Sequence, residues 1–235
     1  MPTGLGGEVM WLCPSLDDSP NDLSGNGNNG TYVNGTSTVA DSDPTYGGSR
    51  AYNFDGTNDY INCGTATSPA DLSMSVWVNV LSFSNKNKGI VGTFNSGGTS
   101  DEYGINASHV GAANSALGAA YGIQAFSPSV MPQNTWHHLV LLRDTAAGFV
   151  RLYENGVLVT QTAIGGSTPP VSATKDFIIG RYGGTQYFGG LMDDVRKYDR
   201  AITQAEVTLL ASTRGFTTGG DGGGTHVHRT LLGVG

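Results

Sequence analysis

The stretch GGLMDDVRKYDRAITQAEV, residues 189–207, predicts a strand that leads into a helix. Its first half alternates in polarity with the period of two that a strand requires, and its second half changes to a helical period. Thr203 followed by Glu206 is the pattern of a capping box, which marks the start of the helix. The adjacent residues Asp193 and Asp194 decide whether this stretch belongs to an active site, a metal site or a scaffold.

Adjacent residues of a strand point to opposite faces of its sheet. The predicted faces are Leu191, Asp193, Val195 and Lys197 on one side, and Met192, Asp194, Arg196 and Tyr198 on the other. The two aspartates should therefore point apart and cannot act as one acid/base pair. We expect at most one of them to bind a metal or cap a loop, and the other to meet Arg196 or Arg200.

The composition outside this stretch indicates one all-β domain. Glycine contributes 36 of the 235 residues without a collagen-like period, and strand-forming residues recur between the glycines. A net charge of −7 with no Lys/Arg cluster argues against nucleic-acid binding. The sequence has no apolar run of the roughly 20 residues that a membrane-spanning helix needs, and residues 1–18 lack a signal-peptide pattern. Cys13 and Cys63 favour two buried thiols, with a disulfide as the alternative.

The strongest strand pattern is residues 73–80, in which apolar and polar side chains alternate around Trp77. Asn155-Gly156 between two further strand patterns predicts a hairpin. Residues 119–126 are expected to form one strand. About a dozen short strands, polar turns and one short helix near the C-terminal end together predict an antiparallel β-sandwich.

Five segments occur in the order and spacing of a known family. They are DLSGNGNNGT (22–31), AYNFDGTNDYI (51–61), SMSVWVNV (73–80), TWHHLVLLRD with VRLYENGVLV (135–144 and 150–159), and IIGRYGG with FGGLMDDVRKYDRAITQAEV (178–207). Over roughly residues 8–212 the chain resembles the laminin-G-like, concanavalin A-like jelly-roll family, which is related to the pentraxins. The resemblance implies two antiparallel sheets with a concave face. It predicts a jelly-roll domain over 1–212, followed by a Gly-rich linker and C-terminal docking tail over 213–235.

The sequence argues against catalysis. The glucanases of the resembled fold carry an E-x-D-x-x-E pattern, which this chain lacks. His137 and His138 are neighbours in a strand pattern and should face opposite sides, so they cannot form one zinc site. His138 is expected to make a structural hydrogen bond. The sequence contains no nucleophile elbow or phosphate-binding loop, so the protein is expected not to be an enzyme.

Calcium is the cofactor that the sequence favours, because calcium binds carboxylate, amide and backbone oxygens supplied by loops. The candidate ligands are Asp22, Asn26, Asn28, Asp55, Asp193 and Asp194. The family resemblance implies a structural calcium near the terminal segments, where the last strand should neighbour the first. The alternative is that these side chains hold their own loops through bonds to backbone amides.

Glycan binding is the other predicted activity, because it needs an exposed aromatic ring with polar groups beside it. Tyr182, Gln186 and Tyr187 are expected to form the rim of such a site. Trp77 is a second candidate, but its place in the strand over residues 73–80 favours a buried position.

The C-terminal tail differs in character from the rest of the chain. The expected partner-docking residues are His226, His228, Arg229, Leu231 and Leu232. The fold is of an extracellular type, a secretion signal is not recognised, and the tail looks suited to docking. These features together favour a phage or virus accessory protein, such as a capsid decoration, head-fibre or tail-fibre protein. Such a protein is expected to dock on other subunits, to form a homo-oligomer and to bind glycans. The alternative is a secreted or cell-surface bacterial lectin-like module, and a glycoside hydrolase ranks third. The predicted location is the virion surface or the extracellular space.

Overall fold

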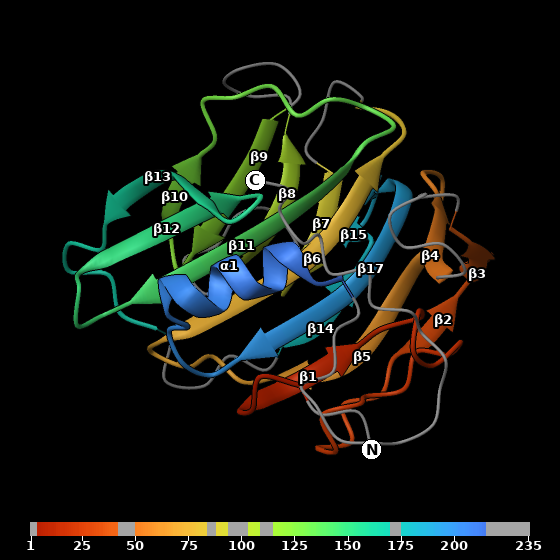
Figure 1. Ribbon diagram of the computed structural model, residues 1–235, viewed down its shortest axis with the longest axis horizontal. Helices are drawn as coiled ribbons and strands as arrows, with labels where there is room; N and C mark the ends of the chain where they lie inside the picture. The colour runs from red at the N-terminus through yellow and green to blue at the C-terminus, as the bar shows by residue number, and fades with distance from the viewer. Residues whose placement is uncertain are drawn as a thin grey trace, which may run out of the picture.

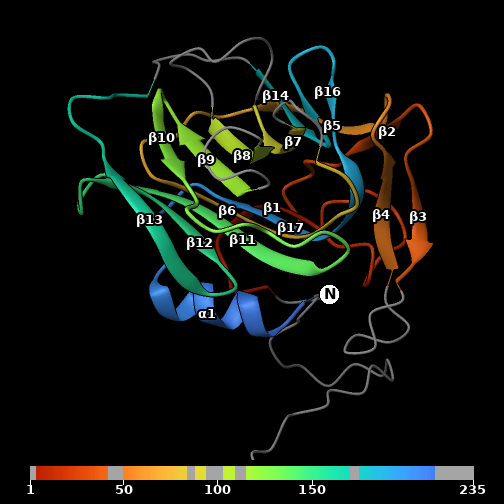
Figure 2. The same ribbon diagram turned by 90° about the horizontal axis from the view of Figure 1, so that it is seen from above.

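Two antiparallel sheets pack face to face, and one helix covers the outside of the first (Figures 1 and 2). The computed structural model describes residues 4–41, 50–83, 88–93, 103–108, 115–169 and 175–214. The first sheet, sheet A, runs in the order β13 (Val157–Ala163), β12 (Phe149–Glu154), β11 (Trp136–Asp144), β6 (Leu72–Val80), β17 (Gly189–Tyr198), β4 (Arg50–Asp55) and β3 (Ser37–Ala40), and β1 (Glu8–Leu12) also pairs with β17. The predicted sandwich is confirmed.

Sheet B forms the second layer. Its order is β10 (Ile123–Phe126), β9 (Ser115–Ala120), β8 (Tyr103–Ser108), β7 (Lys88–Gly92), β14 (Lys175–Ile179), β5 (Tyr60–Ala66) and β2 (Thr31–Val33). A separate hairpin of β15 (Arg181–Tyr182) and β16 (Gln186–Tyr187) lies in the chain between β14 of sheet B and β17 of sheet A. The last strand pairs with the first, as expected, although β17 is a central strand rather than an edge.

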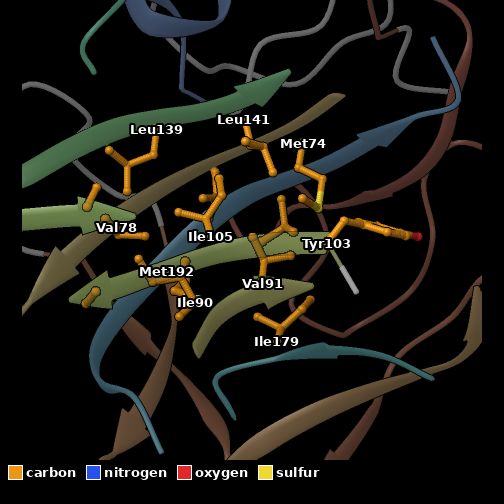
Figure 3. Close-up of a cluster of buried hydrophobic side chains, with 14 of the residues drawn as sticks. Met74, Val78, Ile90, Val91, Tyr103, Ile105, Leu139, Leu141, Ile179 and Met192 are labelled. Atoms are coloured by element: carbon orange, nitrogen blue, oxygen red, sulfur yellow. The ribbon is translucent and has the colours of Figure 1, made fainter. Parts of the chain in front are cut away.

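The hydrophobic core lies between the sheets (Figure 3). Met74, Val76 and Val78 of β6 all face this layer, as the alternating pattern predicts, and they meet residues such as Ile90 and Ile105 from sheet B. Burying a side chain of this size contributes about 1.5–3 kcal/mol. This hydrophobic layer therefore holds the two sheets together. Cys13 and Cys63 are buried free thiols, as predicted.

The helix α1 (Gln204–Ser212) closes a second, smaller apolar layer on the outer face of sheet A. Thr203 and Glu206 form the predicted capping box. Trp77 is buried as expected, but on this outer side, where its indole N–H donates to the carbonyl of Leu210 at 3.1 Å. His138 makes the expected structural hydrogen bond, with 2.8 Å between its Nε2 and Ser75 Oγ. Within the described ranges, no helix is long and apolar enough to cross a membrane.

The turns explain one confirmed and one wrong prediction. Asn155 and Gly156 both have positive φ, at 51° and 83°, and join β12 to β13 as the predicted hairpin. Tyr121 and Gly122 have similar φ values, 50° and 83°, so residues 119–126 are two strands joined by a tight turn and not one strand. A tyrosine rarely adopts positive φ, so this turn cannot be predicted from the residue types.

A β-bulge in β17 overturns the predicted faces of that strand. The pairing with β6 shifts register between Asp193 and Arg196, and Asp194 has φ of 49°. Because a bulge inserts one extra residue, Met192 and Val195 both face the core, although simple alternation places them on opposite sides. Asp193 and Asp194 are both buried outside the core cluster.

Candidate functional site

Tyrosines gather where the chain crosses from sheet B to sheet A. Gly180, with φ of 90°, ends the pairing with β7, and the chain then turns into the β15–β16 hairpin. The backbone of Arg181 and Tyr182 passes directly over Gly89 of β7, where a Cβ would lie less than 3 Å from it. Both strands of the hairpin lie against β7 of sheet B. The glycine in β7 thus permits the hairpin to lie against sheet B.

The hairpin places aromatic rings beside the first residue of β5. The rings of Tyr60 and Tyr187 lie 6.4 Å apart and are tilted by 33°. The Arg181 guanidinium lies over the Tyr60 ring, 4.0 Å from its centroid, which is a cation–π contact. We call Tyr60, Arg181, Tyr182, Gln186 and Tyr187 the tyrosine platform. All five side chains are half-buried, so each keeps part of its surface for a ligand.

The surroundings of the platform are polar and open at the hairpin tip. Gly184 and Thr185 are exposed, and a Cβ on Gly184 would meet nothing within 4 Å. Asn106 of β8 lies opposite Gly89 in the ladder and therefore faces the side on which β15 lies. Its Oδ1 is buried without a hydrogen-bond partner. The platform thus presents tyrosine rings, the Arg181 guanidinium and the Gln186 amide. Rings of this kind can stack on the face of a ligand ring, and the polar groups can bind its hydroxyl groups.

The structure brings the predicted glycan rim together, since Tyr182, Gln186 and Tyr187 all belong to the platform. Sequence reasoning missed Tyr60 and Arg181. The motif GRYGG contains Arg181 next to the predicted rim, but only the fold shows that Tyr60, more than a hundred residues earlier, stacks with it.

A pocket of about 260 Å³ lies elsewhere, at the N-terminal strand. Its lining comprises Val9, Met10, Asn26, Asn28, Cys63, Thr65, Ala66, Thr67, Phe177, Lys197 and Asp199. Lys197 and Asp199 form an ion pair, and Thr67 donates to Asp199 at 3.0 Å. Burial lowers the pKa of Lys197 and raises that of Cys63. The pocket is just below the range of about 300–1,000 Å³ typical of small-molecule sites.

The first group of predicted calcium ligands forms a self-supporting loop beside this pocket. Asp22 accepts hydrogen bonds from the backbone amides of Trp11, Ser24 and Asn28, at 2.9 Å each. The side-chain amides of Asn26 and Asn28 donate to the carbonyls of Glu8 and Val9. This is the loop-holding role that the sequence left as the alternative. Calcium binding by the loop stays a prediction, which thermal melting with and without EDTA tests.

The remaining calcium candidates lie at other places. Asp55 accepts from the backbone amides of Thr57 and Asn58 in the β4–β5 turn. It stands opposite Gly189, four residues along β17 from Asp193, which corresponds to roughly 13 Å. In the ranges that the structure describes, no three His, Cys, Asp or Glu side chains are grouped so that they could hold a metal ion. His226, His228, Arg229, Leu231 and Leu232 lie outside the described residues.

Asp193 and Asp194 belong to a buried charge cluster on the helix side of sheet A. Asp194 accepts from Trp11 Nε1 at 2.7 Å and forms a two-point contact with Arg196, at 2.8 and 3.1 Å. Asp193 accepts from Ser15 Oγ at 2.6 Å and pairs with Arg214, Nε to Oδ2, at 3.2 Å. Arg214 also pairs with Asp41. The two aspartates join the first strand, the last strand and the segment after α1, which is a structural role.

The pH dependence of stability should report on Asp193. Burial raises its pKa to about 6, against the opposing effect of Arg214. An unfolded aspartate titrates near 3.9, so the folded state binds this proton more tightly. Its stabilising contribution is complete below about pH 4 and is lost as the pH rises through about 6.

Urea unfolding from pH 4 to 7 measures this effect as the difference in unfolding free energy between the wild type and Asp193→Asn. The wild type should lose stability relative to the variant across that window. Glu206, whose pKa is lowered to about 2 chiefly by its hydrogen bond to Arg200, contributes the opposite trend in both proteins and cancels in the difference. A difference that stays flat from pH 4 to 7 contradicts the prediction.

Comparison with known proteins supports this description of the fold. Domain 4 of AbnA, a GH43 extracellular arabinanase from Geobacillus stearothermophilus solved in complex with arabinotriose, matches with a TM-score of 0.68 and 20% identity, over 87% of this chain and 98% of that one. The binding domain of Paraclostridial Mosquitocidal Protein 1 matches with a TM-score of 0.66 and 18% identity, over 87% and 52%. The binding domain of botulinum neurotoxin DC, in complex with SialylT, matches with 0.65 and 10%, over 88% and 51%.

The chain thus spans nearly all of the arabinanase domain but only about half of the two toxin binding domains. At these identities the likeness establishes the fold alone. No curated protein matched by sequence. The family model of the laminin-G type described as the concanavalin A-like lectin/glucanases superfamily matches residues 55–208, which include the platform and the β17 bulge. The chain belongs to the concanavalin A-like lectin/glucanase superfamily.

Proposed function

We propose that this protein is a non-catalytic carbohydrate-binding module that holds its ligand on the tyrosine platform. The observation that carries the proposal is the packing of Tyr60, Arg181 and Tyr187 around an open hairpin tip. A sugar ring has an apolar C–H face and a rim of hydroxyl groups. Half-buried tyrosine rings suit the face, and Gln186 and Arg181 suit the hydroxyl groups.

The similar structures support a binding role and reverse the order of the sequence-based hypotheses. One neighbour is a domain of an arabinanase solved with arabinotriose, and others are binding domains of toxins. These relatives favour a secreted or cell-surface lectin-like module over a virion accessory protein, and they support neither capsid docking nor oligomer formation. Extracellular location and glycan partners are accordingly part of this proposal.

The hydrogen bonds of the carboxylates next to the platform support a binding role without catalysis. In the neighbouring turn, Asp55 accepts from the amides of Thr57 and Asn58. Asp59 accepts from the amides of Gly35 and Asp55, at 2.8 and 3.1 Å. Both carboxylates are engaged with backbone donors, Asp55 within its own turn and Asp59 also with the turn between β2 and β3. Glycoside hydrolysis requires two carboxylates placed on either side of the scissile bond.

Tyr187→Ala should weaken glycan binding by at least about tenfold, because aromatic anchors commonly contribute 2 kcal/mol or more at a binding site. The measurement is a glycan array that includes arabinan, galactan, xylan and acidic glycans, followed by calorimetry on the best ligand. Tyr187→Phe is the matched control: it keeps the ring, loses only the hydroxyl bond to the Gly184 carbonyl, and should bind nearly as well as the wild type. The proposal fails if the wild type binds no glycan, or if Tyr187→Ala binds as tightly as the wild type.

A further inference from the structure

We propose that the tyrosine platform selects sugars that carry a carboxylate, and that Arg181 is the residue that binds this group. The inference rests on the proposed function, because it names the class of glycan that the same platform prefers. It concerns sugar acids of two sources, hexuronic acids and sialic acids, which share an ionised carboxylate on a hydroxylated ring.

The first observation is that, among the residues that the structure describes, Arg181 has no acidic partner. Other arginines of the described chain are engaged: Arg50 with Asp18, Arg143 with the carbonyls of Ala70 and Ser167, Arg151 with Asp144, Arg196 with Asp194 and Glu8, Arg200 with Glu206, and Arg214 with Asp41 and Asp193. Within the described residues, the side chain of Arg181 makes one polar contact, the cation–π contact with the Tyr60 ring. In a protein with a net charge of −7, a half-buried cation that lacks an internal acid is available for an external one.

The second observation is that Arg181 is held in a fixed orientation. Its guanidinium lies 4.0 Å from the centroid of the Tyr60 ring, and its Nε is buried without a hydrogen-bond partner. A ligand must therefore reach the guanidinium through its two terminal nitrogens. Paired N–H groups on a planar guanidinium match the two oxygens of a carboxylate, and stacking on an aromatic ring leaves this edge usable.

The third observation concerns the neighbouring charges. Asp55 and Asp59, in the turn before β5, accept hydrogen bonds from backbone amides: Asp55 from its own turn, and Asp59 from that turn and from Gly35 between β2 and β3. The platform thus combines the Arg181 cation for the carboxylate, tyrosine rings for the sugar face and the half-buried Gln186 amide for a hydroxyl group.

The test compares ligands that differ only in charge. Calorimetry at low salt is run with oligogalacturonate against its fully methyl-esterified form, and with sialyllactose against its methyl ester. The wild type should bind at least one acidic ligand about tenfold or more tightly than its neutral partner. The acidic ligand with the higher affinity shows whether the site prefers a hexuronic acid or a sialic acid. The preference should shrink as NaCl rises, because salt screens an exposed charge pair.

Two variants assign the preference to the guanidinium. Arg181→Gln should bind acidic and neutral ligands about equally, because the loss of affinity falls mainly on the acidic ligand. Arg181→Lys keeps the charge but loses the two-point geometry, so it should retain only part of the preference. If the glutamine variant unfolds, the comparison of acidic and neutral ligands on the wild type still tests the preference for a carboxylate. Equal affinity of the wild type for charged and neutral partners overturns the selectivity while leaving the proposed function intact. Binding of no glycan at all overturns the function itself.

Discussion

The alanine variant of Asp194 should unfold roughly 6–20 °C below the wild type. Removing one partner of a buried ion pair costs about 3–5 kcal/mol, and in a domain of this size each kcal/mol lowers the melting temperature by about 2–4 °C. Arg196 would lose its two-point contact, and Trp11 Nε1 would lose its acceptor. Alanine also fits poorly at φ of 49°. Scanning calorimetry measures the midpoint.

Two comparisons separate the causes of this loss. Asp194→Asn tolerates positive φ and keeps an acceptor, so it isolates the missing charge and should cost less than alanine. Asp18→Asn is the control for an ordinary surface pair, because the side chains of Arg50 and Asp18 are 38% and 51% exposed, and it should cost under about 1 kcal/mol. A midpoint for Asp194→Ala within 2 °C or so of the wild type would mean that the cluster contributes little to stability.

Gly89→Ala should destabilise the protein by about 3 kcal/mol and also reduce glycan binding. The new Cβ would collide with the backbone of Arg181 and Tyr182, which cannot swing aside as a side chain can. Overpacking of this kind costs about 1–3 kcal/mol, and a backbone obstacle places this site at the upper end. Moving β15 shifts Arg181 away from Tyr60, so binding should fall with stability.

Gly184→Ala provides the matched control on the same hairpin. A Cβ there meets nothing within 4 Å, so both stability and glycan affinity should stay close to the wild type. Chemical denaturation and calorimetry are run on both variants. If Gly89→Ala binds glycans with unchanged affinity, the hairpin does not form the site, whatever happens to the stability.

The fold was predictable because its signals are local. The alternation in β6, Asn155-Gly156 and the capping box at Thr203 each depend on residues close in sequence, and all three are confirmed. The β17 bulge was not predictable in this way. Asp194 adopts positive φ because buried partners compensate for it: Trp11 from a distant segment, and Arg196 two residues further along the strand. Alternation alone therefore assigns the wrong faces to half of the strand.

The candidate site was predictable only in part, for the same physical reason. Tyr182, Gln186 and Tyr187 lie within a few residues of each other, so a turn motif was enough to group them. Tyr60 and Arg181 meet only when β5 and β14 pair within sheet B. That no acid of the described residues pairs with Arg181 can be established only from the folded structure, in which each of the other described arginines has its partners.

The central position of β17 has a consequence for how the chain is made. This strand pairs with β1, β4 and β6, yet it comes last among the strands of the described residues. A ribosome synthesises the chain from the N-terminal end, so sheet A cannot be completed until nearly two hundred residues have emerged. Until then the edges of β1, β4 and β6 are unpaired and open to association with other chains. Nascent chains of this protein therefore carry several open strand edges until β17 has been synthesised.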